Sequence, residues 1–422
     1  MRSHDPRRGA GGPTPAEPRD PSIALFIAAL GLRPAVIGVG PVASQMASGL
    51  GMSHLFVSTL EAIPIICMGL FAPLGPFIAR RLGDRTAMAI GLALIAIAAS
   101  LRAVVSSPLA ILALTLVVGM ATGAAGALPA VVGKLRASYR RATAAAAASA
   151  TGIVAGATIA AAAAGPAADL LGGWRPSIAL MGAICLVPLA GWLVAVPPYP
   201  AFVVSQALRP AKVWLLPVTW LLALAYGFQG MVYWGANAWL PSAFLERGWS
   251  LSAAGGLVAL LNVGTLVGNV SLIWLSRRVQ LGRLLVMSGI AILAGTLGLA
   301  LQVPLGAPAT VLLGIGNGMI YPVLLALTIT LADDPVMAGS MAAFMLLIGY
   351  ELSAAGPLVL GFVRDAEGSF AIPMALMALM ASCLVGTSIV LAGRTHIERV
   401  APGAVGSAGA VGRPQPPAGG SR

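Results

Sequence analysis

The sequence predicts an all-α membrane protein with twelve transmembrane helices, arranged as two halves of six. Of the 422 residues, 58% are hydrophobic and 9% are charged, and the mean hydropathy is +0.93. About a quarter of the residues in a soluble domain are charged, so this composition excludes that class. The apolar residues fall into runs of roughly 20, the length of helix that spans a hydrocarbon core. A polar stretch divides these runs into two equal sets.

The predicted spans form an N-terminal bundle, 22–196, and a C-terminal bundle, 214–393, joined by a cytoplasmic linker at 197–213. The segments 1–21 and 394–422 are rich in Gly and Pro and are predicted to be disordered cytoplasmic arms. Two sets of six helices with short loops are typical of transporters built from repeated halves. The spans cover residues 22–44, 55–79, 87–106, 109–133, 144–166, 176–196, 214–240, 252–276, 284–303, 307–331, 337–362 and 370–393.

The distribution of lysine and arginine predicts the orientation. Twenty of these 25 residues lie in the terminal arms or in the loops that follow the second, fourth, sixth and eighth spans. Arg102, Arg175, Arg247 and Arg364 are assigned to loops on the opposite side, and Arg33 lies within the first span. Positively charged loops stay in the cytoplasm. Both termini are therefore predicted to be cytoplasmic, in a multi-pass protein of the cell inner (plasma) membrane.

Several other classes are excluded by what the sequence lacks. The net charge of +12 is dispersed over loops and forms no patch for nucleic acid. The three histidines lie in the terminal arms or a loop, so no metal site is expected. The sequence has no P-loop and no dinucleotide fingerprint, so no cofactor is expected. Because the loops leave no room for an extramembrane catalytic domain, we do not expect an enzyme.

Three ionisable residues lie within the spans: Arg33, Glu61 and Glu351. A charge near the bilayer centre costs at least ~2.5–3.5 kcal/mol, and such residues are functional by default. A rise of about 1.5 Å per residue places all three in one layer, from the centre of the membrane outwards. If Arg33 lies between both glutamates, one negative charge stays unpaired, and that carboxylate could carry a proton.

The alternative is a structural role, in which Arg33 forms a salt bridge with one glutamate and holds the two halves together. The sequence does not decide whether Arg33 contacts Glu61, Glu351 or neither.

Polar residues recur at helical spacing in two further spans. Gln229, Tyr233 and Asn237 follow an i, i+4, i+8 pattern in the seventh span, which puts them on one stripe. Asn317 and Tyr321 repeat the i, i+4 spacing in the tenth. Substrate sites of such transporters lie at the midplane between the halves, so we expect these residues to line a substrate cavity. The alternative is that they form hydrogen bonds between helices.

Several segments carry a family resemblance. The loop GPFIARRLGDRT, 75–86, resembles the Gly-Asp-Arg loop of the major facilitator superfamily. LRPAVIGVGP, 32–41, resembles the first-helix signature of the cyanate/2-nitroimidazole transporter (CynX/NimT-like) family. Further similarity to that family lies in residues 63–81, 227–262, 314–329 and 349–369.

The resemblance implies the major facilitator fold and alternating access, with substrate bound between the halves. It also implies an anion-binding role for Arg33, since a guanidinium offers a planar, permanently charged fork. The family pattern is usually uncharged where Glu61 and Glu351 stand. These two carboxylates favour proton coupling, or a cationic or zwitterionic ligand, over simple anion transport.

The sequence therefore predicts a secondary active transporter of a small polar or anionic solute, coupled to protons through Glu61 and Glu351. Its predicted partners are a small-molecule substrate, protons and the lipid bilayer, and it is expected to act as a single chain. One alternative is an efflux carrier for drugs or nitro compounds, which would not need Arg33. Another, from a different class, is a non-transporting membrane sensor on a carrier fold.

Overall fold

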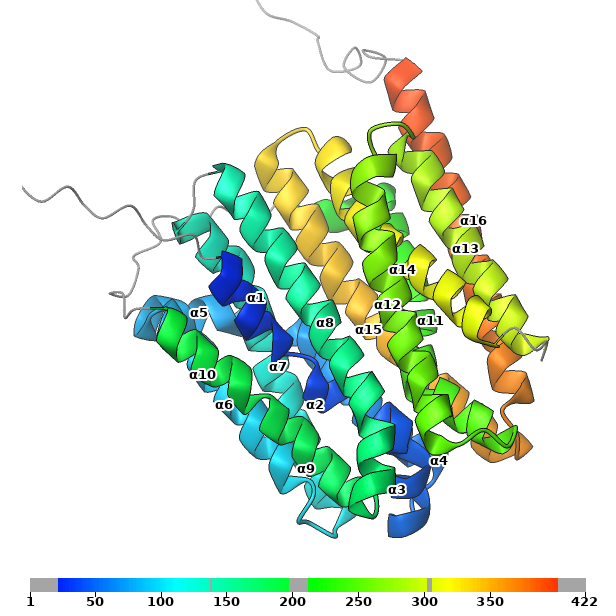
Figure 1. The fold of residues 1–422 in the computed structure, drawn as a ribbon. Helices are drawn as coiled ribbons and strands as arrows, with labels where there is room; N and C mark the ends of the chain where they lie inside the picture. The colour runs from blue at the N-terminus through cyan, green and yellow to red at the C-terminus, as the bar shows by residue number, and fades with distance from the viewer. Residues whose placement is uncertain (1–21, 137–138, 197–211, 302–305, 401–422) are drawn as a thin grey trace, which may run out of the picture.

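The computed structural model describes residues 22–136, 139–196, 212–301 and 306–400, and over these ranges the chain is helical with no strand (Figure 1). The predicted arm at 1–21, nearly all of the predicted linker and residues 401–422 lie outside the described residues. Figure 1 shows the helices of the first half and of the second half as two neighbouring bundles, with α1 beginning and α16 ending near the same end of the molecule.

The first half contains ten α-helices and a short 3-10 helix among the described residues. They are α1 (Ser22–Leu30), α2 (Pro34–Ile37), η1 (Gly40–Val42), α3 (Ala43–Leu50), α4 (His54–Leu70), α5 (Leu74–Leu82), α6 (Asp84–Leu101), α7 (Pro108–Arg136), α8 (Tyr139–Leu171), α9 (Trp174–Ile184) and α10 (Leu186–Ala195). The second half contains η2 (Val213–Leu215), α11 (Pro217–Glu246), α12 (Leu251–Leu275), α13 (Leu281–Ala300), α14 (Gly306–Thr330), α15 (Pro335–Glu367) and α16 (Ala371–Val400).

These helices account for the predicted spans. Ten spans in the described residues are long and apolar enough to cross a membrane, and the bent pair α4–α5 makes an eleventh. The remaining predicted span is α11, whose 30 residues include Gln229 and Asn237 and are therefore less hydropathic. The last span is longer than predicted, because α16 continues to Val400. No proline interrupts the chain between residues 393 and 401, so residues 394–400, predicted as part of the tail, remain helical.

The first span is broken in its middle. α1 ends at Leu30, and the chain makes short turns before α2 begins at Pro34. Proline has no amide hydrogen and cannot continue the hydrogen-bond pattern of the preceding turn, which explains the break. A second proline, Pro41, interrupts the span again at η1. The break leaves Arg33 in the interior of the bundle, outside regular helix.

Of the two largest clusters of buried apolar side chains, one lies mainly in each half, and each includes a few residues of the other half. Glycines permit close helix packing within each half. In the first half, a side chain at Gly152 or Gly156 of α8 would collide with the backbone of α1 at Phe26 or Leu30. This packing fixes the position of α1 and hence the start of the broken segment that carries Arg33.

Candidate functional site

Arg33 contacts both halves of the protein. Its guanidinium carbon lies 4.7 Å from the centre of the Trp234 ring on α11, a cation–π contact. Its Nη1 lies 3.4 Å from Sδ of Met68 on α4. Trp234 is buried, whereas Arg33 is partly exposed. The break in the first span thus places a permanent positive charge at the boundary between the halves.

Four of the chain's six tyrosines gather around this charge. Arg33 interacts electrostatically with Tyr226, Tyr233 and Tyr321. The Tyr226 ring lies 5.6 Å from that of Tyr321 and 5.4 Å from that of Tyr350. The tyrosines come from α11, α14 and α15, so the second half supplies an aromatic surface with hydroxyl groups opposite the arginine of the first.

Most residues of the predicted polar stripe form hydrogen bonds within the second half. Gln229 and Asn317 are hydrogen-bonded to each other through Nε2 and Oδ1, and both are buried. Asn317 Nδ2 also donates to Oγ1 of Thr265 on α12, at 3.3 Å. These bonds link α11, α12 and α14. Gln229 and Asn317 therefore follow the alternative to cavity lining, which is hydrogen bonding between helices.

Asn237 belongs to the same kind of network. Asn262 of α12 donates through Nδ2 to Oδ1 of Asn237, at 3.3 Å, and accepts from the Tyr233 hydroxyl, at 2.8 Å. Asn237 is 1% exposed, whereas Tyr233 is partly exposed and Tyr321 is 36% exposed. Of the predicted stripe, Tyr233 and Tyr321 therefore lie with Arg33, and Gln229, Asn237 and Asn317 support the packing behind them.

The two intramembrane glutamates lie in different surroundings. In the described part of the chain, no ion pair joins either of them to Arg33. Glu351 lies on α15 at the boundary between the halves, where a side chain added at Gly69 of α4 would lie 3.3 Å from its Oε1. That oxygen is buried and has no hydrogen-bond partner.

Glu61 is 1% exposed and lies within the first half. It precedes Met68, the α4 neighbour of Arg33, by about two helical turns, or roughly 10 Å along the axis. Its electrostatic partner is Arg102, which is itself 2% exposed. Of the arrangements that the sequence leaves open, the described residues show the one in which Arg33 forms an ion pair with neither glutamate.

Arg102 is the functional candidate that the sequence reasoning missed. It was assigned to a loop on the outer side because it follows the apolar run of the third span. In the structure it follows α6 and turns back into the bundle. The sequence offers one sign of this position: residues 87–101 are uncharged, so Arg102 is a single charge directly after a long apolar run.

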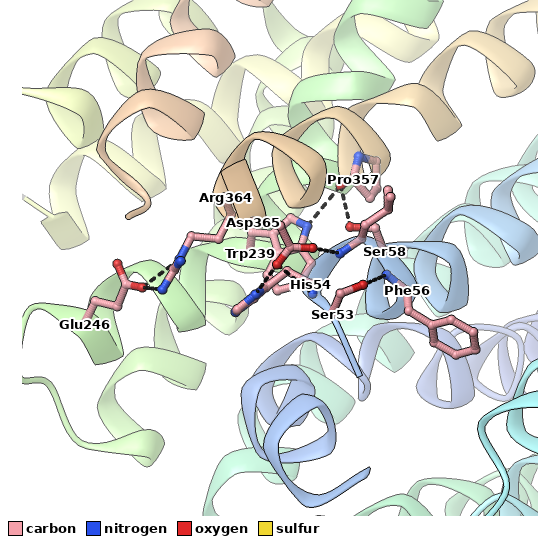
Figure 2. Close-up of polar contacts among 10 residues, drawn as sticks. Ser53, His54, Phe56, Ser58, Trp239, Glu246, Pro357, Arg364 and Asp365 are labelled. Atoms are coloured by element: carbon pink, nitrogen blue, oxygen red, sulfur yellow. Dashed lines mark hydrogen bonds and ion pairs between the residues drawn. The ribbon is translucent and has the colours of Figure 1, made fainter. Parts of the chain in front are cut away.

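The halves are also joined at one end, where α4 begins and α15 ends. We call it the outer end, following the orientation predicted from lysine and arginine. Asp365 of α15 accepts hydrogen bonds from the amides of His54 and Leu55, at 3.0 and 2.8 Å, so it caps the N-terminus of α4 (Figure 2). Its Oδ1 also lies 2.8 Å from His54 Nδ1.

A second contact strengthens this junction. The carbonyl of Pro357 on α15 accepts from Ser58 Oγ of α4, at 2.8 Å, and from Trp239 Nε1 of α11, at 3.1 Å (Figure 2). The His54 ring packs against the Trp239 ring, with 5.4 Å between the centroids. We refer to His54, Ser58, Trp239, Pro357 and Asp365 together as the outer closure.

Two bundles of helices that meet around a charged site, with a junction between them at one end, are the architecture of a secondary transporter. The chain belongs to the Major Facilitator Superfamily, whose family model matches residues 22–357. It is accordingly a multi-pass protein of the inner membrane that transports small solutes as a secondary carrier.

Known relatives agree with the resemblance found in the sequence. The chain is 27% identical to the cyanate transport protein CynX of Escherichia coli (strain K12), over 87% of this chain and 95% of the relative. It is 24% identical to the 2-nitroimidazole transporter of the same organism, over 88% of this chain and 94% of the relative. Both relatives are named as transporters.

Solved structures confirm the fold. A bacterial homologue of the human lysosomal transporter Spinster, in an inward-facing and occupied conformation, matches with a TM-score of 0.71 and 17% identity, over 91% of this chain and 98% of the other. A D-xylose–proton symporter matches with a TM-score of 0.68 and 17% identity, over 88% and 96% of the two chains. At these identities the likeness concerns the fold alone.

Proposed function

We propose that the protein moves a small anionic or polar solute across the membrane by alternating access, with Arg33 as the direct ligand of the solute. The observation that carries this proposal is the position of Arg33, which lies between the halves and has no carboxylate partner among the described residues. Its positive charge is therefore available to an anion. The similarity to a cyanate transporter supports the same assignment.

The surroundings of Arg33 suit a small planar anion. Packing of the guanidinium against Trp234 orients a planar fork of N–H donors. Such a fork binds a carboxylate or a cyanate-like group through parallel, charge-assisted hydrogen bonds. The hydroxyls of Tyr233 and Tyr321 add donors and acceptors that an uncharged part of the solute could use.

Alternating access is supported by the outer closure. It joins α4 of the first half to α15 of the second through hydrogen bonds, and to α11 through the packing of the His54 ring against the Trp239 ring. Opening this end requires those hydrogen bonds to break, and binding of the solute at Arg33 would compensate for part of the free energy lost. The solute is moved without chemical conversion, and we propose that one chain suffices.

Proton coupling is proposed to run through Glu351, one of the two glutamates that the sequence predicts as proton carriers. Glu351 lies at the contact between α4 and α15, which changes when the halves move against each other. Oε1 of this partly exposed glutamate is buried and has no hydrogen-bond partner, so the charged form of the carboxyl is sensitive to a change in its solvation. Proton coupling needs a carboxyl group whose protonation responds to the movement of the halves.

The test uses the purified protein in liposomes that contain a pH-sensitive dye. Cyanate, small carboxylates, zwitterions and 2-nitroimidazole are added in turn to wild type and to Glu351→Gln. We expect proton movement with one class of small anion in wild type and none in the variant. Transport without proton movement, unchanged in Glu351→Gln, would show that the carrier is a uniporter or exchanger.

Efflux of nitro compounds is the second candidate. The aromatic surface formed by four tyrosines and Trp234, together with the similarity to a 2-nitroimidazole transporter, favours it. A neutral aromatic solute would stack on these rings and would not require the charge of Arg33. Efflux that survives in Arg33→Ala would therefore support this candidate over anion transport. If none of the solutes is transported, both candidates are overturned, and the substrate belongs to another class of small solute.

A further inference from the structure

Arg102 reaches into the broken part of the first span. It follows α6 at the outer end, yet only 2% of it is exposed, because its side chain points into the first half. Its Nη2 donates a hydrogen bond to the carbonyl oxygen of Ala35, at 2.5 Å. Ala35 belongs to α2, the four-residue helix that begins directly after Arg33.

The Ala35 carbonyl needs this donor because the helix is interrupted. In a continuous helix it would accept from the amide of Val39. Here the Val39 amide bonds instead to Val36, and the Gly38 amide bonds to Pro34. A buried carbonyl left without a donor is costly. Arg102 supplies a donor from another helix and so holds the broken segment in place two residues from Arg33.

A cation buried this deeply also needs a counter-charge. Oε1 of Glu61, on α4, and Nε of Arg102 are both buried without a hydrogen-bond partner, and no ion pair within the described residues joins the two side chains, so their interaction is electrostatic and acts through the interior. Both residues are at most 2% exposed, so solvent screens their attraction little. Removing either one leaves the other as an uncompensated buried charge.

We infer that Arg102 is a positioning residue for the solute site, and that Glu61 is its counter-charge and not a second proton carrier. Arg102 fixes the segment that presents Arg33, and Glu61 keeps the interior of the first half electrically balanced. Glu351, at the boundary between the halves, is then the one intramembrane carboxyl available for coupling. The inference rests on the proposed function only for the effect of Arg102 on solute binding.

The experiment is a double-mutant cycle on the purified full-length protein. Thermal stability in detergent is measured for wild type, Arg102→Met, Glu61→Gln and the double variant. We expect both single variants to melt well below wild type and the double variant to recover most of the loss, because it retains neither buried charge. Losses that simply add in the double variant would overturn the pairing. Should Arg102→Met fail to fold, folding of the double variant would show the same coupling.

Transport by the same variants separates the two roles. In liposomes, the double variant should drive proton movement with each solute molecule as wild type does, but with a KM raised about tenfold, because Ala35 has lost its donor. A thermally stable Glu61→Gln that transports solute without moving protons would make Glu61 a proton carrier and overturn the assignment. Arg102→Lys, which keeps a charged donor, should restore part of the KM.

Arg247 provides a control in the other half. It donates through Nη2 to the carbonyl of Leu299, at 3.2 Å, and both residues belong to the second half. Arg247→Met should lower the melting temperature without changing KM. An equal rise in KM in this variant would show that the Arg102 effect is general destabilisation. The melting cycle involves no solute, so its outcome does not depend on whether Arg33 binds one.

Discussion

At the scale of single residues, the proposed function depends on an arginine whose neighbours are aromatic. Arg33 is in cation–π contact with Trp234, and a group of tyrosines that contact one another lies nearby. A carboxylate neighbour would neutralise the charge, whereas an aromatic face orients it and leaves it available. The candidate site thus combines a cation that has no carboxylate partner among the described residues with an aromatic surface on which a planar solute could lie.

Replacement of Trp234 tests this arrangement. A cation–π contact contributes about 0.5–2 kcal/mol, so Trp234→Ala should raise the KM for the anion about 2- to 30-fold, and Trp234→Phe should raise it less. Transport rates over a range of solute concentrations measure the change. Trp220→Phe is the control, since this tryptophan is 44% exposed on the surface of the bundle. An unaltered KM in Trp234→Ala would contradict the orienting role.

At the scale of elements, breaks and close contacts between helices position the site. The sequence predicts the first span as one segment, 22–44, and the structure divides it into α1, α2, η1 and α3. The partners of its residues were not predictable, because Met68, Trp234 and Arg102 are distant in sequence and meet only through the rotation and packing of whole helices. Arg102 shows this most clearly, since a position directly after an apolar run gives no sign of which way the side chain turns.

The contact between α1 and α8 gives a prediction about stability. Gly156 lies against the backbone of Leu30, so Gly156→Ala should force the helices apart and destabilise the protein by about 1–3 kcal/mol. Gly126→Ala in α7 is the control, because a side chain there meets nothing within 4 Å. Melting temperatures in detergent measure both variants. Equal melting temperatures would show that the approach of α8 to α1 is less tight than described.

The outer closure gives a prediction about conformation. Asp365→Asn removes a charge that caps α4, which is worth up to about 2 kcal/mol, so the population open at the outer end should rise by up to about 30-fold. Spin labels at exposed positions 170 and 372, on the two halves, would report this as a longer distance. Glu246→Gln is the control, because Glu246 pairs with Arg364 within the second half, at 2.8 Å. The same distance distribution in Asp365→Asn and wild type would exclude a role in closure.

At the scale of the whole molecule, composition and periodicity predicted most of the architecture. The class of protein, the two halves and nearly all spans follow from apolar runs, which depend on the local sequence alone. The candidate site was predicted only in part, since Arg33, Tyr233 and Tyr321 lie together, whereas Gln229, Asn237 and Asn317 form hydrogen bonds between helices. A polar residue within a span can line the candidate site or form hydrogen bonds between helices. Which of the two occurs depends on how deeply the residue lies between neighbouring helices, and the sequence alone does not give this depth.

The most direct test of the central claim, that Arg33 binds an anion between the halves, is the uptake of labelled cyanate or a small carboxylate into liposomes. Wild type, Arg33→Ala and Arg33→Lys are compared at increasing anion concentration. The account predicts saturable uptake by wild type, none by Arg33→Ala, and weak uptake by Arg33→Lys, because an ammonium lacks the planar fork. Uptake of the anion by Arg33→Ala with the affinity of wild type would contradict it.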